Sequence, residues 1–137
     1  MRKSQVAMSI LVLCFLFAGC AKKMSFERSA VVPGADGKVA VTKDKNNNYD
    51  IVVNTVNLPS SKNLTPSRDV YVVWMEDQDK KVKKLGQLKP STSMLSKAYK
   101  AQLKATSTSK PTRVFITAED NGELEYPSNE LVLTTHE

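Results

Sequence analysis

After the first twenty residues, the most apolar run of the sequence is Val70-Tyr71-Val72-Val73-Trp74-Met75. β-Branched and aromatic side chains dominate this run, and such side chains favour strands. The run follows Asp69 and is closed by Asp77-Gln78-Asp79-Lys80, whose residue types are typical of a turn. We therefore predict that residues 69–75 form a central β-strand.

Shorter runs with the same character lie on both sides of this strand and are separated by turn-forming residues. They give the predicted strands 38–42, 49–56, 82–88, 97–106, 112–119 and 130–135. Residues 93–104 could also be read as a helix, but their second half alternates with a period of two residues. Asp120-Asn121-Gly122 predicts a hairpin-type turn between the last two strands. About seven short strands at this spacing predict an all-β fold, an antiparallel immunoglobulin-like β-sandwich.

Alternation along the central strand divides its side chains between the two faces of the sheet. Trp74 shares a face with Val70 and Val72, so we expect Trp74 to lie in the core. The other face carries a candidate binding patch, provided that this face is exposed; it consists of Tyr71, Val73 and Met75. The core that we expect includes Ile51, Val53, Val72, Trp74, Leu85, Leu103, Phe115 and Leu131.

The first twenty residues have the pattern of a secretory signal. Arg2-Lys3 is followed by the apolar run 6–17 and by the small residues of Phe17-Ala18-Gly19-Cys20. The apolar run is shorter than the ~20 residues that a transmembrane helix needs. Its ending resembles the bacterial lipobox, with Phe17 in the place of the common leucine, and this resemblance implies that Cys20 is lipidated. The alternative is an ordinary signal cut near Ala18 that leaves Cys20 free.

Cysteine usage supports lipidation. Cys14 lies inside the signal and would leave with it, so Cys20 would be the only cysteine of the mature chain and would have no disulfide partner. We therefore predict a signal peptide at residues 1–19, a lipidated tether at 20–37 and a β-sandwich at 38–137. The predicted partner is membrane lipid, bound through acylated Cys20, and no aspartate follows Cys20, which favours the outer membrane of the cell envelope.

Charge limits the classes of partner. Removal of residues 1–19 would leave 118 residues with 18 basic and 14 acidic side chains, a formal charge of +4. This weak excess on a secreted chain does not indicate nucleic acid as a partner. Lys22, Lys23 and Arg28 could contact anionic lipid headgroups, or they could belong to a solvated tether.

Candidate catalytic groups are few. The only histidine is His136, and no serine lies in a Gly-x-Ser-x-Gly motif. Glu76, Asp77 and Asp79 lack the spacing of a calcium loop, so we read them as a charged turn. A second acidic group, which we read as a charged loop, consists of Glu119, Asp120, Glu123 and Glu125. We expect no catalytic residue, no metal site and no cofactor.

Several short motifs, spread over residues 49–135, resemble the extracytoplasmic C-terminal domain of anti-sigma-K factors. In chain order they are Leu58-Pro59, Val70-Tyr71-Val72-Val73-Trp74-Met75, Leu85-Gly86-Gln87-Leu88, Val114-Phe115-Ile116-Thr117-Ala118-Glu119-Asp120, Tyr126-Pro127 and Leu131-Val132-Leu133. The resemblance implies an immunoglobulin-like sandwich. It does not imply sigma binding, which in that family belongs to a cytoplasmic helical segment that we do not find before the signal.

The sequence thus favours an envelope lipoprotein with a non-enzymatic β-sandwich that serves as an interaction or structural module. A sensory or ligand-binding module is the alternative, and it would need a concave apolar pocket. An unrecognised hydrolase is a third reading, which would need acidic side chains converging in one cleft.

Overall fold

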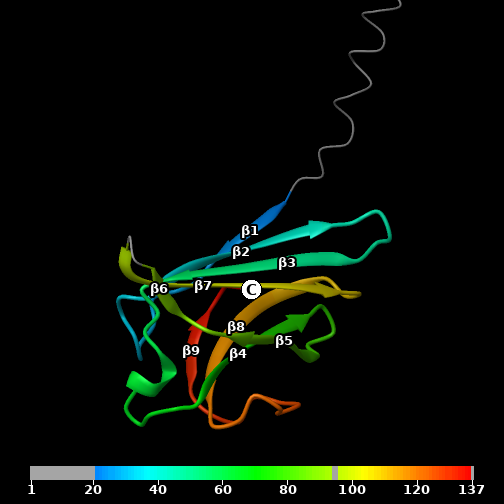
Figure 1. The fold of residues 1–137 in the computed structure, drawn as a ribbon. Coiled ribbons are helices and arrows are strands. Elements are labelled where there is room, and N and C mark those ends of the chain that lie inside the picture. Colours follow the sequence, from blue (N-terminus) through cyan, green and yellow to red (C-terminus); the bar gives the residue numbers. More distant parts are fainter. Residues whose placement is uncertain (1–20, 94–95, 137) are drawn as a thin grey trace, which may run out of the picture.

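Strand β4, which contains the apolar run 70–75, is an inner strand of one of two stacked antiparallel sheets (Figure 1). The computed structural model describes residues 21–93 and 96–136. These residues form nine strands and one short 3-10 helix, η1 (Ser61–Asn63). The strands are β1 (Lys22–Ser25), β2 (Asp36–Lys43), β3 (Tyr49–Val56), β4 (Val70–Asp77), β5 (Val82–Leu88), β6 (Ser91–Ser93), β7 (Ser96–Ser107), β8 (Pro111–Glu119) and β9 (Leu131–Thr134).

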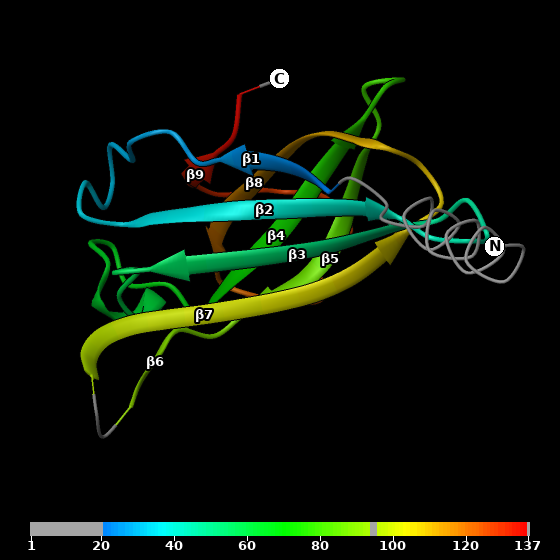
Figure 2. The same cartoon turned by 90° about the horizontal axis from the view of Figure 1, so that it is seen from above.

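The order of the strands confirms the predicted immunoglobulin-like sandwich. The five-stranded sheet has the order β1-β2-β3-β7-β6, and the four-stranded sheet has the order β5-β4-β8-β9. Without β1, these orders correspond to strands A-B-E-D and C′-C-F-G of immunoglobulin domains. The strands of the two sheets cross obliquely when seen from above (Figure 2). The two strands beyond the predicted seven are β1 and β6, both of which are short.

Residues 22–26, which follow the predicted signal, are part of the domain, which corrects the prediction of a tether at 20–37. Strand β1 pairs with β2, with Met24 opposite Val39, and Phe26 forms a β-bridge with Thr135. Met24 and Phe26 are both buried. The Ser29 hydroxyl donates a hydrogen bond to the carbonyl of Val132, which ties the segment to β9. The folded domain therefore begins at about residue 22 instead of residue 38.

Both faces of β4 are buried, so the face predicted to be an exposed binding patch instead lies in the main core between the sheets. Tyr71, Val73 and Met75 are fully buried in the main core between the two sheets, so they do not form an exposed patch. Trp74 is also fully buried, as predicted, but it points away from the other sheet. It belongs to a second apolar cluster with Val72 and Phe115.

The predicted core list is confirmed in most positions and wrong at Leu131. Ile51 and Val53 lie in the main core, while Leu85 and Leu103 are only partly buried against it. Leu131 is 43% exposed, because the register of β9 on β8 shifts between Ile116 and Thr117.

A bulge in β5 requires glycine. The register between β4 and β5 shifts between Val73 and Trp74, and Gly86 next to this shift has φ +153°. A Cβ on Gly86 would lie 3.1 Å from Cδ1 of Leu103 on β7. Glycine thus allows both the backbone conformation and the close approach of β5 to the other sheet.

Candidate functional site

The predicted lipidation site, Cys20, lies outside the described residues, as does the predicted signal at residues 1–19. Strand β1 begins at Lys22, two residues later. Two extended residues span at most about 7 Å. A lipid on Cys20 would therefore hold the sheet directly at a membrane, without the tether over residues 20–37 that the sequence suggested. Among the residues that the structure describes, no helix has the length and apolar character needed to cross a membrane.

Tyr71, the aromatic member of the predicted binding patch, is a structural residue. Its hydroxyl donates a 2.9 Å hydrogen bond to the carbonyl of Pro59, in the segment that leads from β3 toward η1. Burial raises the pKa of the Tyr71 phenol to about 12. The side chain therefore anchors a loop from within the core and offers no surface to a ligand.

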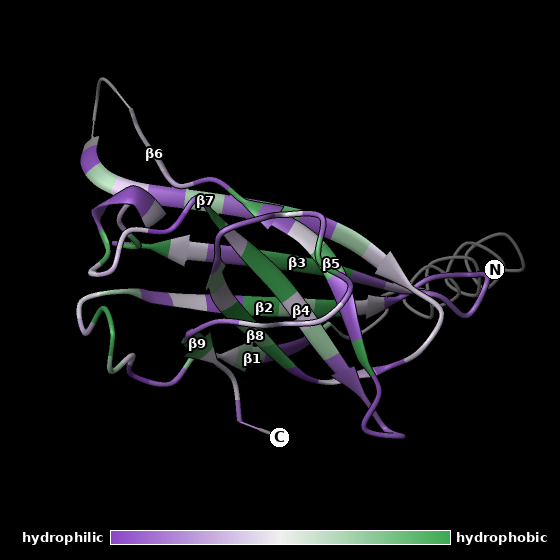
Figure 3. Cartoon of the chain, turned by 90° about the horizontal axis from the view of Figure 1, so that it is seen from below, coloured by the Kyte–Doolittle hydropathy of each residue, from purple (hydrophilic) through white to green (hydrophobic). Residues whose placement is uncertain are grey.

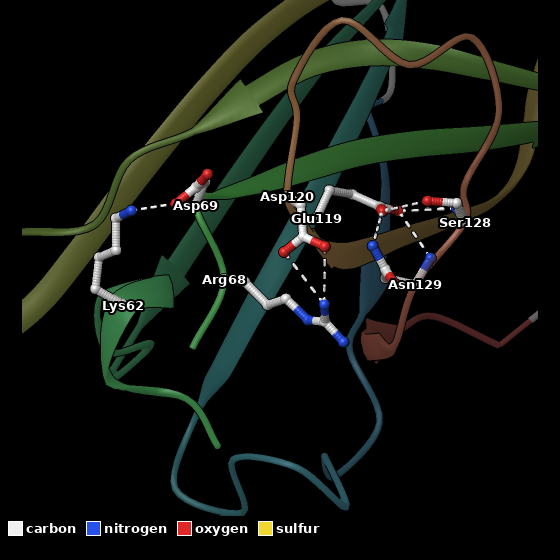
Figure 4. Close-up of polar contacts among 7 residues, drawn as sticks. All are labelled: Lys62, Arg68, Asp69, Glu119, Asp120, Ser128 and Asn129. Atoms are coloured by element: carbon white, nitrogen blue, oxygen red, sulfur yellow. Dashed lines mark hydrogen bonds and ion pairs between the residues drawn. The ribbon is translucent and has the colours of Figure 1, made fainter. Parts of the chain in front are cut away.

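Glu119, read from the sequence as part of a charged loop, is in fact fully buried at the end of β8. Four donors from the returning chain meet its carboxylate: the backbone N–H of Ser128 (3.0 Å), the Ser128 hydroxyl (2.9 Å), the backbone N–H of Asn129 (3.3 Å) and the Asn129 amide (2.9 Å). Thr117 donates a fifth hydrogen bond of 2.7 Å. Figure 4 shows the first four converging on the carboxylate.

These hydrogen bonds keep Glu119 ionised inside the protein. Burial alone would raise the pKa of the carboxyl group, but the hydrogen bonds from Thr117, Ser128 and Asn129 outweigh burial and hold its pKa below the usual value. Both carboxylate oxygens are engaged by donors of the fold. The group is thus suited to fixing the chain and is not placed to attack a substrate.

The segment that Glu119 fixes, residues 120–130, is a long loop and not the tight hairpin turn predicted from Asp120-Asn121-Gly122. It crosses the outer face of the four-stranded sheet (Figure 3). Leu124 packs on the cluster of Trp74 and Phe115, and the Lys84 ammonium donates a 3.0 Å hydrogen bond to the carbonyl of Gly122.

The same loop presents an aromatic side chain to solvent. Tyr126 is 68% exposed, the largest value among the exposed large hydrophobic side chains of the described chain. At the base of the loop, the Arg68 guanidinium donates to both carboxylate oxygens of Asp120, at 3.0 and 3.2 Å (Figure 4). A buried carboxylate and an ion pair thus hold both ends of a loop whose middle is accessible.

The acidic group around Asp77 forms a charged turn, as predicted. The Asp77 carboxylate accepts hydrogen bonds from the backbone N–H groups of Asp79 (2.9 Å) and Lys81 (3.1 Å). Burial opposes ionisation of Asp77, but these backbone hydrogen bonds and the nearby Lys83 hold its pKa below the usual value. Glu76 forms an ion pair of 3.4 Å with Arg113.

The remaining ionisable candidate, His136, lies 2.7 Å from a carboxylate oxygen of Glu27 through its Nδ1. Within residues 21–93 and 96–136, no three His, Cys, Asp or Glu side chains gather in a way that could hold a metal ion.

Comparison with models of known protein families, with curated proteins and with solved structures finds no match. The likeness to the outer domain of anti-sigma-K factors therefore rests on its short motifs alone.

Proposed function

We propose that this chain is a membrane-anchored envelope lipoprotein whose β-sandwich is a non-enzymatic interaction module. The observation that carries the proposal is the position of Cys20, at the end of a signal-like segment and two residues before the first strand. A diacylated cysteine is a stable anchor, because each buried methylene contributes ~0.8 kcal/mol. By the sequence after Cys20, the outer membrane is the favoured location.

The loop at residues 120–130 is the candidate contact surface. Tyrosine is enriched at protein interfaces, because one side chain offers a large rigid area and a polar hydroxyl. Tyr126 is well exposed on a loop that Glu119 and the Arg68–Asp120 pair hold in place. Preorganised loops lose less conformational entropy on binding. In immunoglobulin-like domains, this loop between the last two strands is one of those that commonly carry recognition.

The structural roles of three acidic side chains support the non-enzymatic reading. Glu119 fixes the loop, Asp77 closes a turn and Glu76 pairs with Arg113. Each of these three acidic groups thus has a structural partner that accounts for it.

A sensory or ligand-binding module remains the second candidate. A surface hollow of about 380 Å³, lined by residues 26–28 and 33–36, could receive a small ligand. Its lining includes Phe26, Arg28 and Asp36. Because charged and apolar side chains mix in the lining of this surface hollow, it fits a polar ligand better than the apolar ligand that a concave apolar pocket would take.

Site-specific photocrosslinking in intact cells tests the interaction module. A photoreactive residue replaces Tyr126 in one variant and Lys38, an exposed residue on the outer face of β2, in the control. We expect a discrete crosslinked species that contains one partner at position 126 and not at position 38. Equal or absent crosslinking at the two positions would count against the loop as the contact surface.

A further inference from the structure

One end of the five-stranded sheet gathers exposed cations. The strand register places the start of β1 beside the end of β2, because Lys22 lies opposite Val41. It also places the start of β3 beside the end of β2 and the end of β7, because Tyr49 lies opposite both Lys43 and Ser107. Figures 1 and 2 agree that the start of β1, the β2–β3 turn and the end of β7 lie at the same end of the sheet.

We name this region the anchor end, because it adjoins Cys20 in sequence. Its exposed cations are Lys22, Lys23, Lys43, Lys45, Lys104 and Lys110. They come from β1, β2, the β2–β3 turn, β7 and the β7–β8 connection. Because separate segments of the sequence are needed to assemble them, only the adjacent pair Lys22-Lys23 is evident in the sequence.

Two carboxylates of the β2–β3 region, Asp44 and Asp50, lie at the same end of the five-stranded sheet, and both have local roles. Asp44 accepts hydrogen bonds from the backbone N–H groups of Asn46 (2.7 Å) and Asn48 (2.9 Å), which shapes the β2–β3 turn. Asp50 accepts a 3.0 Å hydrogen bond from the Thr106 hydroxyl.

The β4–β5 turn adjoins this end, because Asp77 lies opposite Pro111. It adds as many acids (Glu76, Asp77 and Asp79) as lysines (Lys80, Lys81 and Lys83), with ion pairs between Lys80 and Glu76 and between Lys83 and Asp77. The turn therefore adds no net charge, and the six cations and two anions of the anchor end leave it positive.

The opposite end of the sandwich has a different electrostatic character. There, cations and acids are more evenly balanced. Lys62 is paired with Asp69 and Arg68 with Asp120 (Figure 4), and the exposed lysines Lys89, Lys97 and Lys100 lie at the same end as the exposed acids Asp36 and Glu130. Arg28, which the sequence grouped with Lys22 and Lys23, lies beyond Phe26, where the chain has left β1. The positive charge is thus concentrated on the side of the domain from which the chain leads back to Cys20.

We propose that the anchor end is a membrane-docking surface that binds the headgroups of anionic phospholipids. This inference rests on the proposed lipid anchor at Cys20. An acylated Cys20 keeps the start of β1, at Lys22, within about 7 Å of the bilayer, which is less than the Debye length of ~8 Å at physiological ionic strength. At this distance, lysines are attracted by a negatively charged leaflet, so the anchor and the cations together give the domain one preferred orientation.

Lysine footprinting of the full acylated protein in vesicles tests the orientation. The protein is reconstituted into vesicles of phosphatidylcholine with or without phosphatidylglycerol (about a third anionic lipid, enough for a negative surface potential) and is treated with an amine-reactive reagent. We expect severalfold slower labelling of Lys43, Lys45, Lys104 and Lys110 in the anionic vesicles only, reversed by high salt. Labelling of Lys89, Lys97 and Lys100 at the opposite end is expected to stay unchanged.

Two matched triple variants separate charge from position. Lys45→Gln/Lys104→Gln/Lys110→Gln removes three anchor-end cations, and Lys89→Gln/Lys97→Gln/Lys100→Gln removes three from the opposite end. Because each near-surface lysine changes membrane attraction about fivefold, the first variant is expected to lose the protection of Lys43 in anionic vesicles, and the second to keep it.

The outcomes distinguish this inference from the function on which it rests. Protein that floats with the vesicles but is labelled equally at both ends overturns the docking surface and leaves the anchor intact. Equal protection of the anchor-end lysines in anionic and neutral vesicles also overturns the docking surface, because closeness to the membrane would then explain the protection without any attraction to anionic headgroups. Protein that carries no lipid and does not float with the vesicles overturns the anchor and the docking surface together.

Discussion

Trp74 and Thr117 are joined across neighbouring strands by a buried hydrogen bond of 2.8 Å from the indole Nε1 to the threonine Oγ1. The same hydroxyl donates to Glu119, whose carboxylate holds Ser128 and Asn129. The only tryptophan of the chain is thus linked through one hydroxyl to the loop proposed as the contact surface. The packing of Trp74 on the outer face of the four-stranded sheet and the position of loop 120–130 therefore depend on the same hydrogen-bond network.

The substitution Thr117→Val tests this link. It nearly preserves side-chain volume, but it leaves the buried indole N–H without an acceptor, which costs about 1–3 kcal/mol. We expect a loss of that size in urea unfolding followed by Trp74 fluorescence. Thr106→Val, which removes an exposed hydrogen bond to Asp50, is the control and is expected to change stability by less than about 0.5 kcal/mol. Equal effects of the two variants would argue against the network.

The ionised state of Glu119 predicts how stability depends on pH. Its pKa is lower in the folded state than the ~4.3 of an unfolded glutamate. The unfolded chain therefore binds more protons in acid, and the stabilisation from Glu119 is complete above the unfolded pKa and is lost as the pH falls through the folded pKa. Urea unfolding between about pH 7 and pH 3 should show stability falling below about pH 5.

Glu119→Gln should make that fall in stability shallower, whereas Glu123→Gln, at an exposed position of the same loop, should leave it as in the parent protein. Asp77, whose pKa is also lowered, accounts for part of the remaining slope. A parent protein that becomes more stable on acidification, or a Glu119→Gln variant with an unchanged slope, would contradict an ionised Glu119.

Replacement of Gly86 by alanine should destabilise the sandwich. The backbone at Gly86 has φ +153°, and an added Cβ would lie 3.1 Å from Leu103. Strain of this kind costs on the order of 1–3 kcal/mol. Gly34→Ala is a suitable control, because no atom lies within 4 Å of the position that its Cβ would take and its backbone is not in the strained region.

Combining Gly86→Ala with Leu103→Ala separates the two causes of that loss. If the contact with Leu103 dominates, the double variant loses less stability than the sum of the single variants. If the backbone conformation dominates, the two losses add. A Gly86→Ala protein as stable as the parent would mean that β5 has no bulge requiring glycine.

Phe26→Ala distinguishes a folded N-terminal segment from a tether. Phe26 is buried against the core, and truncation of a buried phenylalanine typically costs about 3 kcal/mol or more. Arg28→Ala, at an exposed position two residues later, should change the unfolding free energy little. Thermal or urea unfolding measures the stability of both variants. A Phe26→Ala variant as stable as the parent would mean that this segment is a tether and not part of the folded domain.

Much of the fold could be predicted because most strands bury one face. Residues 49–56 and 82–88 were predicted with the bounds that the structure has, since alternation and turn residues mark their ends. Strand β1 was missed because only Met24 and Phe26 alternate there, beside two lysines that suggest solvent.

The faces of β4 could not be assigned from alternation. A strand buried on both sides reads as apolar throughout, and what covers its outer face is a loop some fifty residues later in the chain. Glu119 was misread for a similar reason, because its donors at Ser128 and Asn129 meet it only after the loop returns. The one available signal was the spacing of Phe115, Thr117 and Glu119, which places all three on the face of β8 that carries the Trp74 cluster.

The intact mass of the protein purified from cell membranes shows whether Cys20 carries a lipid that holds this sandwich at a membrane. A lipid anchor at this position predicts a polypeptide of residues 20–137, with an N-terminal peptide that carries a diacylglyceryl group on Cys20, and no such mass for Cys20→Ala. An N-terminal peptide with an unmodified Cys20, or a chain that still contains residues 1–19, would contradict it.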